Sequence, residues 1–371
     1  MDREPPVKKI LLIGPLPDPV TGISLANHTI KEYIGKYGGK YAISSINMSY
    51  NELEGQGRIG KISFEKVFFY SKFYKNLFKI FAADIVYITP GLTFFGVVKY
   101  APFIYLAKTL RKEIITHIHG NYLHIEYQNV SDWKKFVMKA ILSKTDKGIV
   151  LSNSLVCNMA PFIDKKNIYV LENFVEDAIF PAKDEVKEFH TDYLRILYLS
   201  NLMPEKGIFD LLDALLILQE KNIKFTAQIA GAIDIQHQAK IQEMLDKLSK
   251  NVEYLGIVRS QAKKAAFMKS NIFVLPTYLP WEGQPISVLE AMATGNVVLT
   301  SRHAGIPDIF KENENGYYVN KRDPENIAQK LIDISRNLTG QKHIMVHNQE
   351  IAAEKYRVEN YIKNFIAILA S

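Results

Sequence analysis

The chain has 371 residues, of which 47% are hydrophobic and 23% charged, a composition typical of globular proteins rather than disordered ones. This length exceeds what one ordinary core organises and predicts two domains. The formal net charge of +7 would suit nucleic acid, an anionic membrane surface or phosphate-bearing substrates. Because no recognised nucleic-acid-binding module is present, we expect no nucleic-acid partner.

The single cysteine, Cys157, excludes an internal disulfide framework and fits a reducing compartment. It stands among apolar residues, so we expect a small core side chain. Met1–Lys9 is polar and the apolar run Ile10–Ile13 is too short for a signal peptide. The uncharged stretch Ile85–Val98 is broken by Pro90 and Gly91 and is too short to span a membrane. We therefore expect a cytoplasmic protein, either soluble or peripheral at the inner face of the membrane.

Short apolar runs alternate with longer amphipathic segments along the chain, the pattern of parallel α/β domains. The strands expected in the first half are Ile10–Ile13, Tyr41–Ile46, Ile85–Ile88, Ile114–Ile118, Gly148–Leu151 and Ile168–Leu171. The helices expected there are Ser24–Gly35, Phe95–Arg111, Trp133–Ser143 and Ser154–Pro161. The strands expected in the second half are Ile196–Ser200, Thr226–Ala230, Val252–Leu255, Ile272–Pro276 and Val297–Thr300. Helix-like sequence follows each of these, most clearly Ile208–Gln219.

A charged stretch containing Pro181, residues 176–191, separates the two series and predicts the domain boundary. We expect a first domain over residues 1–176, a second over 177–355 and a C-terminal helix over 356–371. Periodicity does not tell which domain that helix packs on. Two such domains in series would bind ligands in a cleft at the carboxyl ends of their strands.

Residues 61–81 alternate lysines with aromatic residues, including Phe68 and Phe69. This pattern is typical of a helix that lies in a membrane interface. It is equally typical of a helix that buries its rings in a core and exposes its lysines to water. The hydrophobic pattern does not decide between an anionic membrane surface and the protein core.

The segment PTYLPWEGQPISVLEAMATG, residues 276–295, carries the densest functional signal. A strand ends at its start, and a helix begins near Pro285, which a first helical turn tolerates. The first-turn amides would be unpaired and suited to phosphate: Ile286, Ser287 and Val288. Glu282 and Glu290 could then accept hydrogen bonds from hydroxyls of a sugar and a ribose. Alternatively, Glu282 is a solvated loop residue and Glu290 is favoured by the helix dipole.

A second signal is Thr116-His117-Ile118-His119-Gly120, where an expected strand ends. Two residues that are two apart on a strand face the same side, so His117 and His119 could approach one metal ion. Two histidines without a carboxylate partner at fixed spacing are weak evidence for zinc. We therefore expect no metal cofactor.

Residues 276–295 resemble the E-x7-E motif of glycosyltransferase family 4, retaining enzymes of the GT-B fold, with Glu282 and Glu290 matching its two glutamates. Further segments resemble the family's other motifs and cover the second half in the right order: 198–207, 229–231, 254–258, 304–309 and 315–317. The resemblance implies an α/β protein with two Rossmann-like domains that face each other across a cleft. It leaves open whether the C-terminal helix crosses back to the first domain.

The resemblance implies a role for each matching residue of the second half. Lys206 would neutralise the donor diphosphate, and Asn201 replaces an arginine of the family, which removes one positive charge from the expected clamp. Glu290 would bind the ribose and Glu282 the donor sugar. The residues expected around the sugar and phosphate are Gly283, Gln284, Pro285, Ile286 and Ser287, and those expected near the base are Val258 and Arg259.

The first half matches the family more loosely. Residues 13–24 resemble its first strand and glycine loop, in which Gly22 would let a helix N-terminus approach the diphosphate. Thr21 stands where the family often has another glycine. His119 matches a histidine near the reacting carbon. The resemblance thus implies Glu282, His119 and Lys206 as the catalytic group.

These implied roles describe a metal-independent, retaining glycosyltransferase that uses a nucleotide diphosphate sugar as donor. Its acceptor would be a saccharide or lipid-linked saccharide, in the assembly of a bacterial cell-surface polysaccharide. Two alternatives remain. One is a nucleotide-sugar epimerase of the same fold, and the other is a catalytically inactive sugar-nucleotide binder, which the loss of the arginine at Asn201 would allow.

Overall fold

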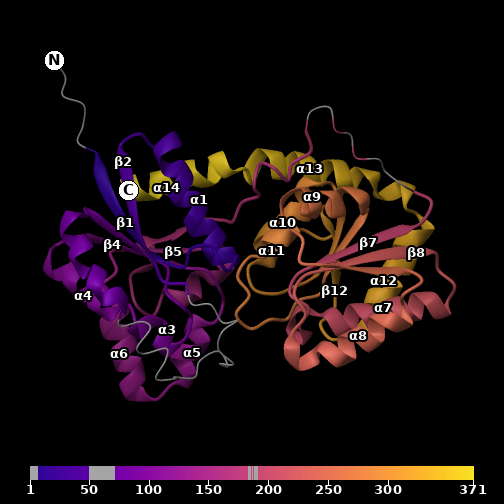
Figure 1. Ribbon diagram of the computed structural model, residues 1–371, viewed down its shortest axis with the longest axis horizontal. Coiled ribbons are helices and arrows are strands. Elements are labelled where there is room, and N and C mark those ends of the chain that lie inside the picture. Colours follow the sequence, from indigo (N-terminus) through magenta and orange to yellow (C-terminus); the bar gives the residue numbers. More distant parts are fainter. Residues whose placement is uncertain (1–6, 50–71, 183–184, 186, 188–190) are drawn as a thin grey trace. The chain divides into compact units, whose positions relative to one another are not determined.

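Both halves of the chain form a parallel sheet covered by helices (Figure 1). The computed structural model describes residues 7–49, 72–182, 185, 187 and 191–371. The chain divides into two units. Unit 1 consists of Met1–Asn173 together with Glu359–Ser371, and unit 2 is Phe174–Val358.

The sheet of unit 1 has six parallel strands in the order β2-β1-β3-β4-β5-β6. They are β1 (Lys8–Gly14), β2 (Tyr41–Asn47), β3 (Ile85–Ile88), β4 (Glu113–Ile118), β5 (Lys147–Val150) and β6 (Ile168–Val170). The central strands are continuous apolar runs because helices bury both of their faces. All six expected strands of this half are confirmed, with shifts of one or two residues at their ends.

Helices cover both faces of this sheet. They are α1 (Gly22–Tyr37), η2 (Lys72–Ala82), α3 (Phe94–Val98), α4 (Ala101–Thr109), α5 (Leu123–Asn129), α6 (Asp132–Leu142), η3 (Asn153–Asn158), η4 (Lys165–Asn167) and α14 (Val358–Ala370). Helices α1 and α14 lie on one side, and α3, α4 and α6 lie on the other (Figure 1). The C-terminal helix α14 therefore packs on unit 1, where the Phe365 ring contacts Tyr87 with 5.2 Å between ring centroids.

The expected helix Phe95–Arg111 is in fact two helices. Helix α3 ends at Val98 and α4 begins at Ala101, with Pro102 in its first turn. A proline inside a continuous helix would lack the N–H for its backbone bond and would clash with the carbonyl four residues earlier, here Val98. The helix must therefore restart at the proline.

The expected helix Ser154–Pro161 is only the short 3₁₀ turn η3, and the expectation that Cys157 belongs to the core is wrong. A 3₁₀ helix repeats every three residues, so Leu155 and Asn158 share its buried side. Cys157 lies between them in sequence and is exposed. Helix α5 was not expected from the sequence pattern.

The sheet of unit 2 also has six parallel strands, in the order β12-β11-β10-β7-β8-β9. They are β7 (Leu194–Leu199), β8 (Phe225–Ala230), β9 (Val252–Gly256), β10 (Ile272–Leu275), β11 (Val297–Ser301) and β12 (Gly316–Val319). The five expected strands are confirmed. Strand β12 was not expected as a strand because its four residues, Gly-Tyr-Tyr-Val, show neither a long apolar run nor alternation.

The helices of unit 2 lie between these strands and, from α12 onward, after the last of them. They are η5 (Pro204–Lys206), α7 (Ile208–Glu220), η6 (Ile235–His237), α8 (Gln238–Lys247), α9 (Ser260–Lys269), α10 (Ile286–Ala293), α11 (Ile306–Ile309), α12 (Pro324–Arg336), η7 (Thr339–Gln341) and α13 (Lys342–Lys355). One buried apolar cluster runs through this unit, from Val175 to Tyr356.

Residues 61–71 of the basic-aromatic segment 61–81, including Phe68 and Phe69, lie outside the described residues. Its remainder is part of η2, where Tyr74 packs on Phe103 while Phe78 and Phe81 are exposed. Throughout the described part of the chain, every helix is either too short or too polar to cross a bilayer.

Candidate functional site

Three loops of unit 2 meet at the carboxyl ends of β7, β10 and β11. The Tyr278 N–H donates to the Glu205 carbonyl over 2.8 Å, which ties the loop after β10 to the loop after β7. The Ser301 hydroxyl donates to the Thr277 carbonyl, which ties in β11. Gly207, at the end of η5, has a φ of +76°, and a Cβ there would lie 2.5 Å from the Pro276 side chain. Glycine is therefore required for this close approach.

Lys206 and Glu282 form an ion pair between these loops. The Lys206 Nζ lies 2.6 Å from Glu282 Oε2, and the Thr277 hydroxyl donates to the same oxygen over 3.0 Å. Both charged side chains are largely buried. The structure thus brings together two of the three residues expected to act in catalysis. A cation and a carboxylate held on rigid loops can bind an anion and a hydroxyl group side by side.

Glu290 makes a second buried ion pair. Its Oε1 lies 2.5 Å from the Nζ of Lys263 on α9, and the same Nζ is 3.4 Å from Glu176. Burial raises the pKa of the Glu290 carboxyl, and the charge of Lys263 opposes that shift. Burial lowers the pKa of Lys263, but attraction to Glu290 and Glu176 outweighs it, so the net shift is upward. Glu290 is thus held in place by Lys263 inside unit 2.

Helix α10 begins as expected after Pro285, but one of its expected free amides is engaged. The Val288 N–H donates to the Pro285 carbonyl over 3.1 Å. It closes a tight first turn, so the expectation of three unpaired amides is wrong for Val288. Ile286 and Ser287 precede the intrahelical ladder. Gly283, Gln284 and Pro285, which lead into the helix, are buried.

The other expected donor-binding residues of unit 2 follow β7 and β9, two strands that β8 separates in the sheet. Asn201 comes two residues after β7 and is exposed. Val258 and Arg259 follow β9, and Arg259 is the residue before α9. Gly231 follows β8, and a Cβ at this glycine would lie only 1.8 Å from the Ser200 carbonyl. The loops after β7 and β8 are therefore packed backbone to backbone.

In unit 1, Gly22 is the first residue of α1, which begins two residues before the expected start at Ser24. The residue before it, Thr21, caps the helix: its hydroxyl accepts from the Ser24 N–H over 3.1 Å, and the Ser24 hydroxyl accepts from the Thr21 N–H over 2.8 Å. This reciprocal capping box gives a local reason for threonine in place of glycine.

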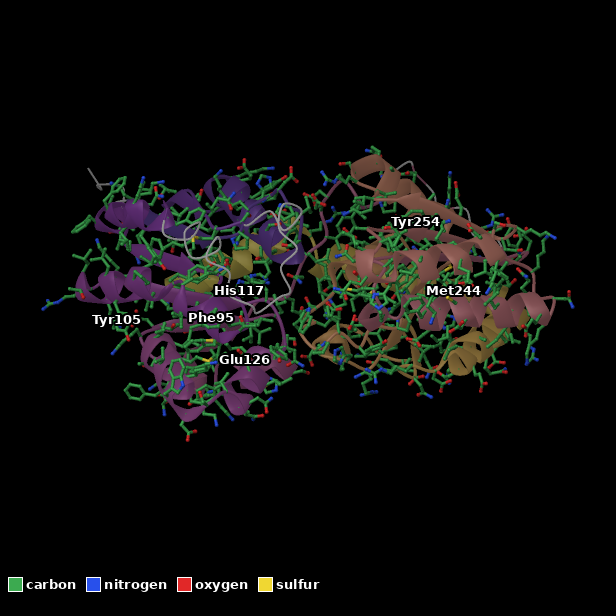
Figure 2. The ribbon with its side chains drawn as sticks, turned by 60° about the horizontal axis from the view of Figure 1, so that its bottom comes forward. Phe95, Tyr105, His117, Glu126, Met244 and Tyr254 are labelled. Atoms are coloured by element: carbon green, nitrogen blue, oxygen red, sulfur yellow. The ribbon has the colours of Figure 1, made fainter. Side chains whose placement is uncertain are left out.

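His119 follows β4 in unit 1, and its ring lies tilted against that of His117 with 3.8 Å between centroids. His117 is buried inside the unit (Figure 2), and its Nδ1 lies 2.7 Å from the Tyr87 hydroxyl. Burial lowers the pKa of His119 to about 3. Its buried Nε2 has no hydrogen-bond partner within the described residues. A neutral imidazole at this position can make a hydrogen bond but cannot supply a proton at neutral pH.

Three side chains at these positions were missed by sequence reasoning: Lys263, Thr277 and His303. The His303 Nε2 lies 2.7 Å from the Leu279 carbonyl, which holds the loop that carries Glu282. Thr277 is visible within segment 276–295, and its place directly after a strand could have marked it. Lys263 lies 27 positions before Glu290, so no spacing rule could have paired them.

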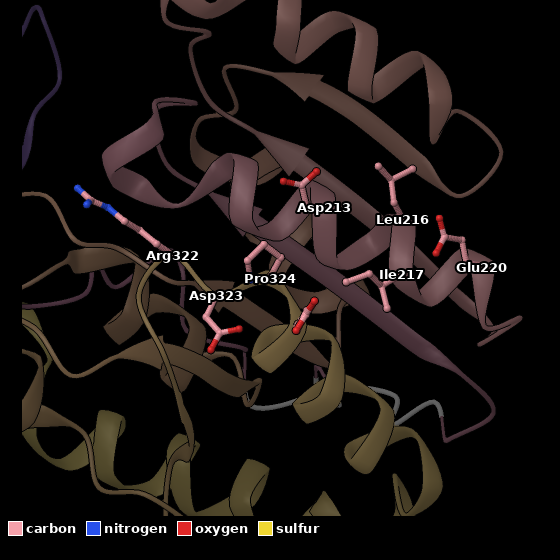
Figure 3. Close-up of a pocket in the computed structure, with 8 residues that line it drawn as sticks. Asp213, Leu216, Ile217, Glu220, Arg322, Asp323 and Pro324 are labelled. Carbon is pink, nitrogen blue, oxygen red and sulfur yellow. The ribbon is translucent and has the colours of Figure 1, made fainter.

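No cluster of three or more histidine, cysteine, aspartate or glutamate residues that could hold a metal ion occurs among the described residues. A shallow depression of about 530 Å³ lies between α7 and α12 (Figure 3). Four carboxylates, from Asp213, Glu220, Asp323 and Glu325, line it beside Arg322. Their charge disfavours phosphate, and the depression contains none of the expected site residues.

Comparison with protein families matches residues 180–350 to glycosyl transferases group 1. The chain is 30% identical over 147 residues to the amylovoran biosynthesis glycosyltransferase AmsK of Erwinia amylovora, a match that covers 38% of this chain and 36% of AmsK. It is 24% identical over 261 residues to the poly(ribitol-phosphate) alpha-N-acetylglucosaminyltransferase of Staphylococcus aureus, covering 68% of this chain and 50% of that protein. The chain thus spans little more than a third of the curated relatives it matches first.

Solved structures resemble the chain over nearly its whole length. Anabaena HepE in complex with UDP superposes with a TM-score of 0.75 at 15% identity, covering 98% of this chain and 99% of HepE. Sucrose-phosphate synthase from Thermosynechococcus elongatus superposes with a TM-score of 0.73 at 16% identity, covering 98% of each chain. At these identities the likeness shows the fold, two parallel α/β units in series, which is that of the GT-B glycosyltransferases.

Proposed function

We propose that this chain, whose residues 180–350 form a glycosyl transferases group 1 domain within a GT-B fold, transfers a sugar from a nucleotide diphosphate donor to a saccharide or lipid-linked saccharide acceptor. The observation that carries the proposal is the buried Lys206–Glu282 pair, which the family-matching unit holds at the carboxyl ends of its strands. This edge is where α/β sheets bind their ligands.

Lys206 supplies the positive charge for the leaving diphosphate. When the donor binds, its phosphate competes with Glu282 for the Lys206 ammonium, which lies 2.6 Å from the carboxylate. Glu282 then accepts a hydrogen bond from a hydroxyl of the donor sugar, while Thr277 keeps its carboxylate in place. As the bond to the anomeric carbon breaks, negative charge grows on the phosphate, and a pre-positioned cation stabilises it without reorganisation.

The beginning of α10 and the Glu290–Lys263 pair hold the rest of the donor. The N–H groups of Ile286 and Ser287 point out of a helix N-terminus, which attracts phosphate. Glu290 accepts hydrogen bonds from the ribose hydroxyls, and Lys263 keeps this carboxylate charged and oriented. In unit 1, the neutral imidazole of His119 can form a hydrogen bond with a hydroxyl group of a saccharide.

Two relatives suggest the biological setting. AmsK and the WcaL protein of Escherichia coli are named for the biosynthesis of amylovoran and colanic acid. We extend this to the present chain and propose a role in assembling a bacterial cell-surface polysaccharide at the cytoplasmic side of the membrane. HepE was solved with UDP-glucose, which makes UDP-sugars the first donors to test. Retention of configuration at the anomeric carbon is part of the same proposal.

Substitution of the two glutamates tests the assignment. Glu290→Ala should raise the KM for the donor, because a charged acceptor for ribose hydroxyls is worth about 1–3 kcal/mol. Glu282→Ala should chiefly lower kcat, because its partner is the reacting sugar. Glu243→Ala, at an exposed position on α8, is the matched control and should change neither constant. Small and equal effects of the two site substitutions would refute the assignment.

A donor screen decides the reaction class. UDP-, GDP- and ADP-sugars are incubated with and without saccharide acceptors, and free nucleotide and new glycosides are measured. Glycoside formation that persists in chelator supports metal-independent transfer, because Lys206 and the α10 N-terminus supply the positive charge. Loss of transfer in chelator and its recovery with a divalent ion would overturn that part of the proposal. Epimerised donor without acceptor would indicate an isomerase, and the absence of turnover with intact donor binding would indicate an inactive binder.

A further inference from the structure

An exposed group of aromatic side chains lies on α3 and α6 of unit 1. Trp133 is 61% exposed, Phe136 74% and Phe95 39%. Trp133 and Phe136 are one helical turn apart on α6 and therefore share a face. The core-facing side of the same helix is separate and consists of Met138, Ile141 and Leu142. Helix α6 thus presents large rings on the face where a helix at a protein surface normally presents polar groups.

Contacts between the rings hold this group together. The Trp133 ring packs edge-on against Phe94 with 5.4 Å between centroids, and Phe94 packs against Phe95 at 5.0 Å. The Lys134 ammonium lies 5.6 Å from the Trp133 ring centroid and 5.9 Å from that of Phe95. We name the set Phe95, Trp133, Lys134, Phe136 and Lys139 the aromatic-basic face.

The charges around the face are mostly positive. Lys134, Lys139 and Lys144 form no ion pair among the described residues, whereas Asp132 lies 3.6 Å from Lys135 and Asp146 lies 2.7 Å from Lys108. The nearby carboxylate of Glu126 accepts a hydrogen bond from the Phe94 N–H. The local acidic groups are therefore neutralised or engaged, and the lysines beside the rings retain their charge.

The two units also differ in net charge. Unit 1 has 24 lysine and arginine residues against 15 aspartate and glutamate residues, a formal charge of +9. Unit 2 has 22 against 24, a formal charge of −2. The excess positive charge of the chain therefore lies outside the unit that matches glycosyl transferases group 1, so the donor phosphate of the proposed function does not account for it.

We propose that the aromatic-basic face docks unit 1 onto an anionic lipid surface. Exposed tryptophan and phenylalanine rings enter the boundary between headgroups and acyl chains, while lysines beside them attract anionic lipids. Phe78 and Phe81 on η2 are 66% and 62% exposed and provide further rings. Helix η2 lies in the connection from β2 to β3, and α6 lies in the connection from β4 to β5. Both connections run in the same direction across the sheet, so right-handed crossovers place the two helices on the same face. Phe95 and Tyr105, on α3 and α4 and labelled in Figure 2, are also exposed.

Vesicle binding tests the proposal independently of any transferase activity. Wild-type protein should sediment with vesicles of phosphatidylcholine and phosphatidylglycerol, and far less with phosphatidylcholine alone. The chain has two tryptophans, Trp133 and Trp281. In a Trp281→Phe variant, the emission of Trp133 should therefore shift to shorter wavelength on binding and be quenched by brominated lipid. The replacement of Lys134 and Lys139 by Gln should weaken binding about fivefold per lysine.

The double variant Trp133→Ser, Phe136→Ser should lower binding by at least about tenfold per ring. Ile235→Ser, at an 82% exposed apolar position on unit 2, is the matched control and should bind like wild type. Thermal unfolding confirms that the exposed-site variants fold. No binding by the wild type, or undiminished binding by the double variant, overturns the proposal. Binding that heparin abolishes and that leaves Trp133 emission unshifted identifies a soluble polyanion site and also overturns it.

Discussion

Asn201 is the residue at which the chain departs most clearly from the family pattern. The side chain is exposed, and its backbone carbonyl accepts from the Tyr198 hydroxyl over 3.0 Å. The loop conformation is therefore held by backbone contacts that do not depend on the asparagine side chain. Lys206, by contrast, is already paired with Glu282. Under the proposed function, this single lysine carries most of the diphosphate clamp.

Asn201→Arg should restore the second positive charge without disturbing the fold. Because the side chain is exposed, the arginine has room, and we expect the melting temperature to stay unchanged and the donor KM to stay equal or fall. Steady-state kinetics and thermal unfolding measure both. Lost activity in a folded variant would show that the pocket is shaped around asparagine.

The two histidines of unit 1 make a prediction about acid stability. Burial lowers the pKa of His119 to about 3 and the pKa of His117 well below its ordinary value of 6.5. Below pH 6.5 the unfolded chain binds a proton at each histidine, whereas the folded chain does not. The free energy of unfolding should thus be constant above this pH and fall below it, by about 1.4 kcal/mol per pH unit per histidine.

Urea unfolding across this acid range measures the slope. His119→Asn should make the stability of unit 1 less sensitive to acid. His28→Asn, at an exposed position on α1, should leave the sensitivity as in wild type. An identical acid slope in the His119 variant and the wild type would mean that the imidazole is protonated in the folded protein.

At the scale of elements, α1 and α6 differ in how their N-termini are capped, although the residue types before them are similar. Both helices are preceded by a residue suited to capping, Thr21 and Ser131. Only Thr21 makes the side-chain bond, in the reciprocal arrangement with Ser24, whereas Ser131 makes no side-chain cap bond. Residue type gives the propensity to cap, but the local backbone decides whether the bond forms.

Thr21→Ala should lower the free energy of unfolding by about 1 kcal/mol, because it leaves the Ser24 N–H in the first turn of α1 without its side-chain partner. Ser131→Ala should have almost no effect, since no cap bond is lost. Chemical denaturation of the two variants provides the comparison. Equal losses would show that the α1 cap contributes nothing specific.

The expected elements agree with the structure where burial on both faces makes a strand a continuous apolar run, as in β1, β3 and β10. They disagree where local backbone geometry dominates. Pro102 divides the expected helix 95–111 because its ring excludes a continuous backbone bond ladder. Strand β12 and η3 are too short for either period to be visible in the sequence.

At the scale of the whole molecule, α14 joins the last residues of the chain to its first unit. Phe365 is fully buried against Tyr87, and the Lys147 Nζ donates to the Ile368 carbonyl over 2.9 Å. Unit 1 is therefore built from two segments separated by the whole of unit 2. Its stability depends on residues that follow the family-matching part of the chain.

Phe365→Ala should destabilise unit 1 by about 3–5 kcal/mol, the usual cost of removing a buried phenylalanine side chain. Lys363→Ala, exposed on the same helix, is the control and should change stability little. Hydrogen exchange should show faster opening of β1 and β3 with unchanged protection in unit 2. Faster exchange confined to unit 2 would contradict the assignment of α14 to unit 1.

The sequence by itself determined the α/β class, eleven of the twelve strands described here and the segment that carries Glu282 and Glu290, because these depend on local apolar runs and short spacings. Only the tertiary structure decided which groups meet: Lys206 with Glu282, Lys263 with Glu290, and α14 with unit 1. It also decided that Trp133 and Phe136 face outward on a helix whose sequence would equally allow them in the core. Contacts between residues distant in the chain arise from packing, which no periodicity records.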